Sequence, residues 1–276
     1  MLFCIGTGEP GAPAPAEGGG SVLRLLSNQN FNPTRLIVVS FGAIILLGTF
    51  LLHLPISARD GQFTPWLTCL FTATSATCVT GLVLVDSALH WTPFGQGVIL
   101  AMIQLGGLGF VSLISLIPLL LRRRIGLSQR LAIASAFNLN GMSGVVRVVR
   151  HALMGTFLLE GCGAILLATR FVPLFGWGRG LWYSIFHSVS AFCNAGFDLM
   201  GEHTGAFSSL AGFREDPVVL GTIGCLIVLG GLGFFVWEDC LEHRSWRRLS
   251  FYSRMVLAVT GALILGDRMS GKEYLG

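Results

Sequence analysis

Two long apolar stretches and a shorter, more polar one alternate along the first part of the chain. The long stretches cover 36–54 and 95–121, and the segment 64–82 between them carries seven Thr or Ser residues. An α-helix needs about 20 apolar residues to cross the hydrocarbon core of a bilayer, because it rises ~1.5 Å per residue. The pattern therefore predicts two membrane-spanning helices that flank a segment poorly suited to spanning.

The same order returns in the second half of the chain, at about 148–171, 181–197 and 217–242. Residues 71–82 match 186–197 with five identities in twelve, at an offset of 115. The motif IQLGGLGF at 103–110 matches IVLGGLGF at 227–234 with seven identities in eight, at an offset of 124. An internal repeat of this kind indicates that one structural unit occurs twice.

The repeat divides the chain into four regions. The first region is rich in Gly, Pro and Ala, buries too little apolar area to offset the entropy of ordering, and is expected to be disordered. Two repeat units follow, and the last region is interpreted as the truncated start of a third unit. The four regions are 1–30, 31–126, 127–250 and 251–276.

Composition supports a membrane protein. Hydrophobic residues make up 53 % of the 276 residues and charged residues 12 %, and the mean hydropathy is +0.72. The charged fraction is about half that of an ordinary soluble domain, which excludes disorder of the chain as a whole and argues against one water-soluble core. The net charge of +4 comes without a basic stripe of the kind that binds nucleic acid. Seven scattered cysteines without a C-x-x-C pair are interpreted as packing residues, and no cofactor is predicted.

The arginines predict the orientation. Six Arg and no acid lie in 122–150, and four more Arg lie in 238–254, whereas the opposite loops hold more acids than bases. Basic residues favour cytoplasmic loops, so the N-terminus and both ends of each unit are expected on the cytoplasmic side. The segment between the two helices of a unit must then enter from outside and return there. The predicted fold is an all-α polytopic membrane protein built from tandem units of outer helix, re-entrant pore loop and inner helix.

Re-entrant backbone can bind cations. Non-helical backbone at membrane depth leaves carbonyl groups unpaired, and in ion filters such carbonyls replace the hydration shell of the ion. Gly81 and Gly196 occupy equivalent positions, where glycine allows backbone angles closed to other residues. The alternative for each glycine is a helix C-cap. Asp86 and Asp198 follow shortly afterwards, as acids that concentrate cations at an outer mouth or as solvated loop charges.

The segments TATSATCVTGL with VLVD, IQLGGLGF, and SAFCNAGFDL with LGGLGF resemble the first two pore units of the Trk/Ktr/HKT superfamily of potassium transporters. The resemblance covers about 34–266 and is greatest to the membrane subunit of bacterial Ktr systems. It implies potassium uptake across the bacterial plasma membrane, with sodium coupling left open, through four units around one ion path. The filter carbonyls that it implies belong to Val79, Thr80, Gly81, Leu82, Asn194, Ala195, Gly196 and Phe197.

The resemblance also implies partner proteins, and it implies twice as many pore units as this sequence contains. It implies a homodimer and a cytoplasmic nucleotide-binding regulatory subunit that docks on the Arg-rich face. Only two of the family's four pore units are present, so we expect either a fragment from a disrupted reading frame, which is favoured, or half of a dimeric pore. The alternative to a transporter is a non-conducting structural subunit that needs a second chain.

Residues inside the predicted helices add further hypotheses. Glu160 lies in an apolar helix, where a carboxylate needs a partner, so we expect it to support the second pore helix or its filter by hydrogen bonds. The alternative for Glu160 is a protonated or Arg-paired packing residue. Close helix packing is favoured over hinging for the inner-helix glycines, which are Gly106, Gly107, Gly109, Gly230, Gly231 and Gly233.

No enzymatic activity is predicted. The densest candidate cluster joins Ser188 or Ser190 with His187, and a second joins Cys193 with Asp198. Ser188 and His187 are adjacent in sequence, so on a helix they point to different faces. We therefore interpret His187 as a packing residue, and the chain as a transporter without a nucleophile and base pair.

Overall fold

The computed structural model describes residues 33–109, 145–243 and 245–270. Every regular element in these ranges is helical, apart from one isolated bridge between Ala58 and Trp91. This agrees with the predicted all-α class. The predicted tail 1–30 and most of the Arg-rich link between the two repeat units lie outside the described residues.

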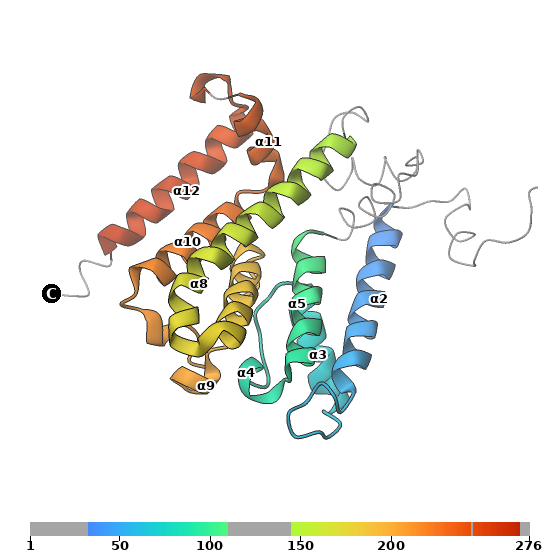
Figure 1. The fold of residues 1–276 in the computed structure, drawn as a ribbon. Helices are drawn as coiled ribbons and strands as arrows, with labels where there is room; N and C mark the ends of the chain where they lie inside the picture. The colour runs from blue at the N-terminus through green and yellow to red at the C-terminus, as the bar shows by residue number, and fades with distance from the viewer. Residues whose placement is uncertain (1–32, 110–144, 244, 271–276) are drawn as a thin grey trace, which may run out of the picture. The chain divides into compact units, whose positions relative to one another are not determined.

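The first repeat unit contains three main helices, α2 (Pro33–His53), α3 (Trp66–Thr77) and α5 (Pro93–Gly107), which pack against one another (Figure 1). The helix α3 has 12 residues, too few to cross a bilayer. The short helix α4 (Ser87–His90) precedes α5. Thr92 caps α5 by accepting from Gly95 N–H, and Pro93 supplies the first helical residue, where a missing N–H costs nothing.

The second unit begins with α8 (Val145–Phe192), which is two helices joined at a kink. Gly176 has φ 80° and ψ 168° inside it, three residues after Pro173, and proline interrupts the hydrogen bonding of a helix. The kink separates the predicted outer helix from the predicted short segment. The short helices α9 (Gly201–Thr204) and η1 (Ala211–Phe213) follow, and α10 (Pro217–Gly231) begins at an Asp216 cap and Pro217, in the manner of Thr92 and Pro93.

The sequence predicts one continuous helix over 217–242, whereas the structure divides this range into α10 and α11 (Phe234–Glu242). Gly233 between them has φ 83°, and the two helices meet at an angle of 92°. Gly109, its counterpart at an offset of 124, has φ 72° after the end of α5. The predicted helix over 95–121 is likewise wrong as one continuous helix, because α5 ends at Gly107. Both inner helices therefore stop at the same left-handed glycine of the LGGLGF motif, because a residue at positive φ cannot continue a right-handed helix.

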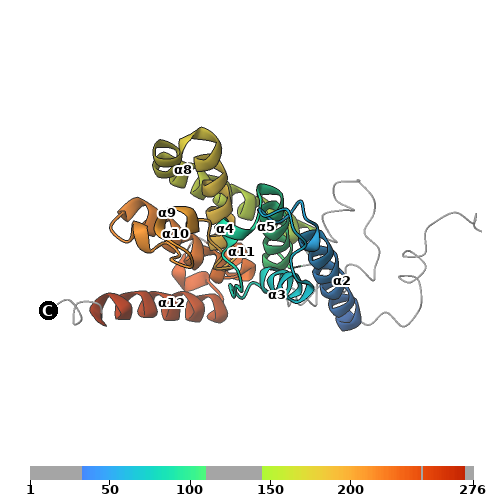
Figure 2. The same cartoon turned by 90° about the horizontal axis from the view of Figure 1, so that it is seen from below.

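The last elements within the described residues are η2 (Trp246–Arg248) and α12 (Phe251–Ser270), and α12 packs against α11. The two repeat units meet through α5 with α8 and through α4 with α9. Figure 2 shows α2, α3 and α5 side by side, next to the second unit.

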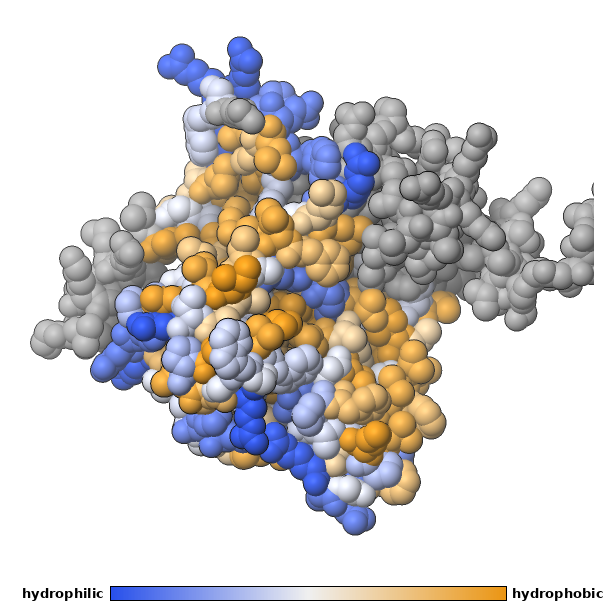
Figure 3. Space-filling view, viewed as in Figure 1, coloured by the Kyte–Doolittle hydropathy of each residue, from blue (hydrophilic) through white to orange (hydrophobic). Residues whose placement is uncertain are grey.

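Much of the apolar surface is exposed, as a bilayer protein requires. Within the described ranges, Arg150–Phe192 is long and apolar enough to cross a membrane, and α10 with α11 passes the same test as one bent span. Only 33 % of the most apolar window of Arg150–Phe192 is buried, whereas a core helix of a soluble protein is mostly buried. Orange apolar side chains cover large areas of the face in Figure 3.

Candidate functional site

The residues directly after α3 and directly after α8 share the same pattern of φ angles. Val79 and Asn194 both have φ 57°, and Gly81 and Gly196 both have φ 73°. The residue between each pair has negative φ, so the sign of φ alternates over three residues in both copies. A β-branched residue rarely adopts positive φ, which marks Val79 as a constrained position.

The two turns also share their hydrogen bonds. Thr80 N–H donates to Ser75 O at 3.0 Å, and Ala195 N–H donates to Ser190 O at 2.7 Å. Such a bond, running five residues back around a left-handed residue, is the Schellman ending of a helix. The left-handed capping residues are therefore Val79 and Asn194, and not the glycines. The alternative that Gly81 and Gly196 are helix C-caps is thus wrong, and their positive φ belongs to the extended segments beyond the caps.

The two segments meet at their glycines. A Cβ placed on Gly81 would lie 2.7 Å from the carbonyl oxygen of Ala195, and a Cβ placed on Gly196 would lie 3.5 Å from the Cα of Gly81. A Cβ at 2.7 Å from a backbone oxygen cannot be accommodated without a shift, so only glycine fits at position 81. The fold thus brings together two stretches of backbone that are 115 residues apart in sequence.

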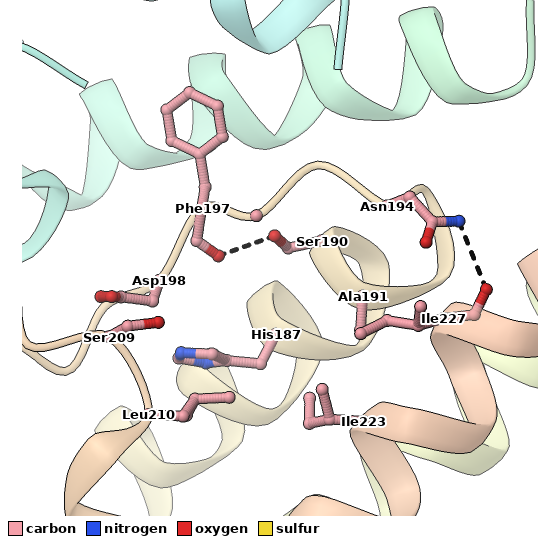
Figure 4. Close-up of a pocket in the computed structure, with 11 residues that line it drawn as sticks. His187, Ser190, Ala191, Asn194, Phe197, Asp198, Ser209, Leu210, Ile223 and Ile227 are labelled. Carbon is pink, nitrogen blue, oxygen red and sulfur yellow. Dashed lines mark hydrogen bonds between the residues drawn. The ribbon is translucent and has the colours of Figure 1, made fainter. Parts of the chain in front are cut away.

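The flanking residues are held differently in the two copies. Phe197 is buried, and its carbonyl oxygen accepts from Ser190 Oγ at 2.6 Å. Leu82, its counterpart, is 60 % exposed. Asn194 Nδ2 donates to Ile227 O at 3.4 Å, which ties this segment to α10 (Figure 4).

A cavity of about 230 Å³ lies beside the second segment, between His187, Asp198, Leu210 and Ile223 (Figure 4). His187 is 2 % exposed, and both of its ring nitrogens have partners. Nδ1 lies 2.7 Å from Tyr183 O, and Nε2 accepts from Leu199 N–H at 3.2 Å. His187 therefore serves packing and chain positioning.

The two acids near the glycines, Asp86 and Asp198, lie close enough for their charges to interact. Asp86 is buried, and its carboxylate accepts from Ala88 N–H and Leu89 N–H at the start of α4 and from Phe207 N–H of the second copy. Burial raises the pKa of Asp198, the Met200 N–H opposes that rise, and the charge of Asp86 adds to it. Asp86 thus caps α4 and fastens it to the second unit, while the role of both acids at an outer mouth stays a prediction.

The inner-helix glycines make close contacts in both copies. A Cβ on Gly106 would collide with Thr77 O, and a Cβ on Gly230 would collide with Phe192 O, which is the equivalent carbonyl. Gly107 leaves room for the side chain of Cys193. A Cβ on Gly231 would lie 3.9 Å from Asn194 Nδ2, which is an ordinary van der Waals contact. Close packing thus accounts for the first glycines of each motif, and Gly109 and Gly233 end the helices.

Glu160 lies on α8, where it contacts Cys193 at the start of the second segment, and it is 5 % exposed. Its two carboxylate oxygens accept from Gln104 Nε2 at 3.0 and 3.2 Å, and Cys193 Sγ donates to Oε1 at 3.9 Å. Ser188 Oγ donates to the backbone oxygen of Glu160 at 2.6 Å. Gln104 is not among the residues singled out from the sequence, although Gln104 and Val228 form the single mismatch in the repeated IQLGGLGF motif.

A charged cluster between the two units is not apparent from the sequence, because its members are far apart in the chain: Arg59 precedes α4, Arg179 and Tyr183 lie on α8, and Glu202 lies on α9. Arg59 of the first unit forms an ion pair with Glu202 of the second, and Arg179 lies 3.6 Å from the same carboxylate. Tyr183 OH donates to Glu202 at 3.4 Å. This cluster joins the two units on the side where Asp86 also joins them.

The residues considered for catalysis are engaged elsewhere. Ser188 and Ser190 donate to backbone oxygens and not to His187. Within residues 33–109, 145–243 and 245–270, no group of three or more His, Cys, Asp or Glu side chains could hold a metal ion.

Comparison with known proteins identifies relatives. Residues 26–260 match the model of the TrkH family, described as cation transport proteins. The potassium/sodium uptake protein NtpJ of Enterococcus hirae is 38 % identical over 246 residues, which cover 89 % of this chain and 53 % of that protein. Ktr system potassium uptake protein B of Bacillus subtilis is 38 % identical over 235 residues, 85 % of this chain and 51 % of the relative. The Ktr protein B of Vibrio alginolyticus is 34 % identical over 235 residues, covering 84 % and 50 %. The chain therefore spans about half the length of the relatives it matches.

Proposed function

Since this chain belongs to the TrkH family of cation transport proteins, and not to an enzyme family, we propose that it takes part in potassium uptake across the plasma membrane. In this proposal the ion passes carbonyls of 79–82 and 194–197. The observation that carries the proposal is the contact at Gly81 and Gly196 between two segments that share their φ values at both pairs of positive-φ residues and the hydrogen bond that closes the preceding helix.

The chemistry of the ion supports this role for the segments. A dehydrated potassium ion needs several oxygen ligands to replace its water, and rings of backbone carbonyls provide them in ion filters. When the sign of φ alternates along the backbone, successive peptide N–H groups point to one side, as in the nests that bind anions. The carbonyl oxygens of the same peptides then point to the other side. In the proposed pore these carbonyl oxygens face the ion.

The short helices fit this proposal as pore helices. The helix α3 is too short to span, and the kink at Gly176 makes the end of α8 a separate segment. Each ends at the proposed filter with its C-terminus, the end at which the helix dipole is negative and favours a cation. In the proposed topology both helices descend from the outer face and the filter segments return there.

The rest of the ring must come from further units. Two segments supply two of the four sides implied by the resemblance, so we propose that other sequence of the same polypeptide, or a second copy, supplies the remaining carbonyls. A homodimer and a cytoplasmic nucleotide-binding regulatory subunit complete the proposed assembly, and three relatives are named as proteins of a Ktr potassium uptake system.

Growth of a potassium-uptake-deficient bacterium tests the proposal. The gene is expressed at its full encoded length, its product is quantified in the membrane fraction, and growth is followed at low potassium. We expect restored growth together with uptake of potassium or rubidium. A product present in the membrane at normal levels without any uptake would refute the proposal and would favour a non-conducting subunit.

A further inference from the structure

The repeated inner-helix motif differs between its two copies at one position. Residues 103–110 and 227–234 are identical except that Gln104 is replaced by Val228. An amide on a membrane helix has a cost unless it finds a partner. The first copy therefore carries a polar group that the shared architecture of the two units does not require.

The structure shows the partner of this amide. Gln104 on α5 donates to both carboxylate oxygens of Glu160 on α8 at 3.0 and 3.2 Å. The pair crosses the boundary between the first and the second unit, where α5 packs against α8. A carboxylate that is 5 % exposed would be strongly destabilising without such donors.

The carboxylate in turn reaches the second proposed filter segment. Cys193 Sγ donates to Glu160 Oε1 at 3.9 Å, and Cys193 directly precedes Asn194, the left-handed residue at which the segment begins. Gly107, three residues along α5 from Gln104, has no side chain and so leaves the space that the Cys193 side chain occupies. The helix α5 therefore contacts the second segment both through Glu160 and by direct packing.

The corresponding positions in the other copy are apolar. Gly48 contacts Met102 as Gly163 contacts Leu226, so the outer helices also align at an offset of 115. In that alignment Ile45 is the equivalent of Glu160. In the inner-helix alignment Val228 is the equivalent of Gln104. Between the two units that the structure describes, the polar pair therefore occurs at their shared boundary and has no polar counterpart at Ile45 or Val228.

We propose that Gln104 is a positioning residue for the second filter segment, acting through Glu160 on Cys193 and thereby on the carbonyls of 194–197. This inference rests on the proposed function. It makes one boundary of the pore a determinant of potassium over sodium selectivity, although Gln104 itself does not touch the ion path. The mechanism requires the hydrogen bond between positions 104 and 160 and is indifferent to which of the two carries the carboxylate.

The test uses the gene at its full encoded length in the uptake-deficient bacterium, and the readout is the ratio of potassium to sodium uptake per amount of protein in the membrane. Gln104→Leu removes the hydrogen-bond donor. Gln104→Glu places a second carboxylate against that of Glu160. Gln104→Glu combined with Glu160→Gln exchanges the amide and the carboxylate between the two positions. Val228→Leu is the matched control, because it changes the equivalent position in the copy without the pair.

We expect Gln104→Leu to lower the selectivity ratio about fivefold, the factor corresponding to one net hydrogen bond. Gln104→Glu should lower the ratio further, and the exchanged pair should restore it to within about twofold of the original, since the hydrogen bond is formed again. Val228→Leu should leave the ratio unchanged.

Three results would overturn this inference. An unchanged ratio in Gln104→Leu would do so, as would an exchanged pair no better than Gln104→Glu alone, or an equal loss in Val228→Leu. If the unaltered protein transports potassium in the same assay, these results refute the inference and leave the proposed function standing. Absence of uptake by the unaltered protein would overturn both.

Discussion

At the residue scale, Gly81 has a positive φ, and backbone of the second segment occupies the space that a Cβ would need. Its φ of 73° alone would cost another residue about 1–2 kcal/mol. The carbonyl of Ala195, 2.7 Å from the position of a Cβ, adds a collision that no rotamer change relieves. Gly61 offers a comparison, because it has φ 67° and nothing within 4 Å of its Cβ position.

We therefore expect Gly81→Ala to displace the segment 194–197 and to lower potassium over sodium selectivity at least about tenfold, since ~1.4 kcal/mol suffices for that factor. Gly61→Ala carries the same backbone strain without the collision, so it should reduce stability by about 1–2 kcal/mol and leave selectivity unaltered. Uptake of the two ions measured side by side distinguishes the variants. Equal selectivity in both variants would contradict the account of Gly81.

At the scale of single helices, α10 starts with a charged cap. Asp216 accepts from Val218 N–H and Val219 N–H and pairs with Arg170 on α8. Although partial desolvation opposes them, the Val219 and Val218 N–H groups and Arg170 hold the pKa of Asp216 below its ordinary value of 3.8. A depressed folded-state pKa stabilises the protein above the unfolded value, and the contribution is lost as the pH falls through the folded value.

Thermal unfolding of the protein in detergent, followed against pH, tests this cap. Asp216→Ala should lower the melting temperature at pH 6, and the difference from the unaltered protein should shrink as the pH falls below 3.8. Asp216→Asn keeps a capping oxygen and should show a smaller effect at pH 6. A difference that stays constant from pH 6 to pH 3 would exclude the charge of Asp216 as the cause.

The contact between α10 and the end of α8 gives a second prediction at this scale. Gly230→Ala places a methyl group against Phe192 O, and such overpacking typically costs about 1–3 kcal/mol. Gly224 lies on the same helix with nothing within 4 Å of its Cβ position. Gly224→Ala should therefore be neutral or stabilising by up to ~1 kcal/mol, because alanine is the better helix former.

Melting temperatures of the two variants, purified in the same detergent, check this expectation. A lower value for Gly230→Ala and an equal or higher value for Gly224→Ala would support close packing as the role of Gly230. A loss of stability in Gly224→Ala equal to that in Gly230→Ala would show that the helix, and not the contact, is the sensitive feature.

At the scale of the whole molecule, the repeat proved the most informative feature of the sequence. The offset of 115 that relates Cys78 to Cys193 in sequence also relates the backbone of Val79 to Asn194 and of Gly81 to Gly196. A shared local sequence can specify such a turn, because the Schellman ending depends on residues within six positions. The all-helical class follows from composition and apolar length in the same local way.

Contacts between distant residues could not be read from the sequence. Asp86 accepts from Phe207 N–H, 121 residues later, and an acid in a loop gives no sign of such a partner. The break at Gly233 was missed because LGGLGF lies within an apolar run that is typical of an uninterrupted helix. Gln104 was visible as a mismatch in the repeat, but only the structure shows that Glu160 lies opposite it.

The central claim is that an ion is held by backbone carbonyls where 79–82 meets 194–197. The most direct measurement is anomalous diffraction from crystals of the full-length protein grown with rubidium, a substitute for potassium. The account predicts a rubidium peak within coordination distance of the carbonyl oxygens around Gly81 and Gly196. A map with no peak there, or with rubidium bound only by side-chain carboxylates such as Asp198, would contradict it.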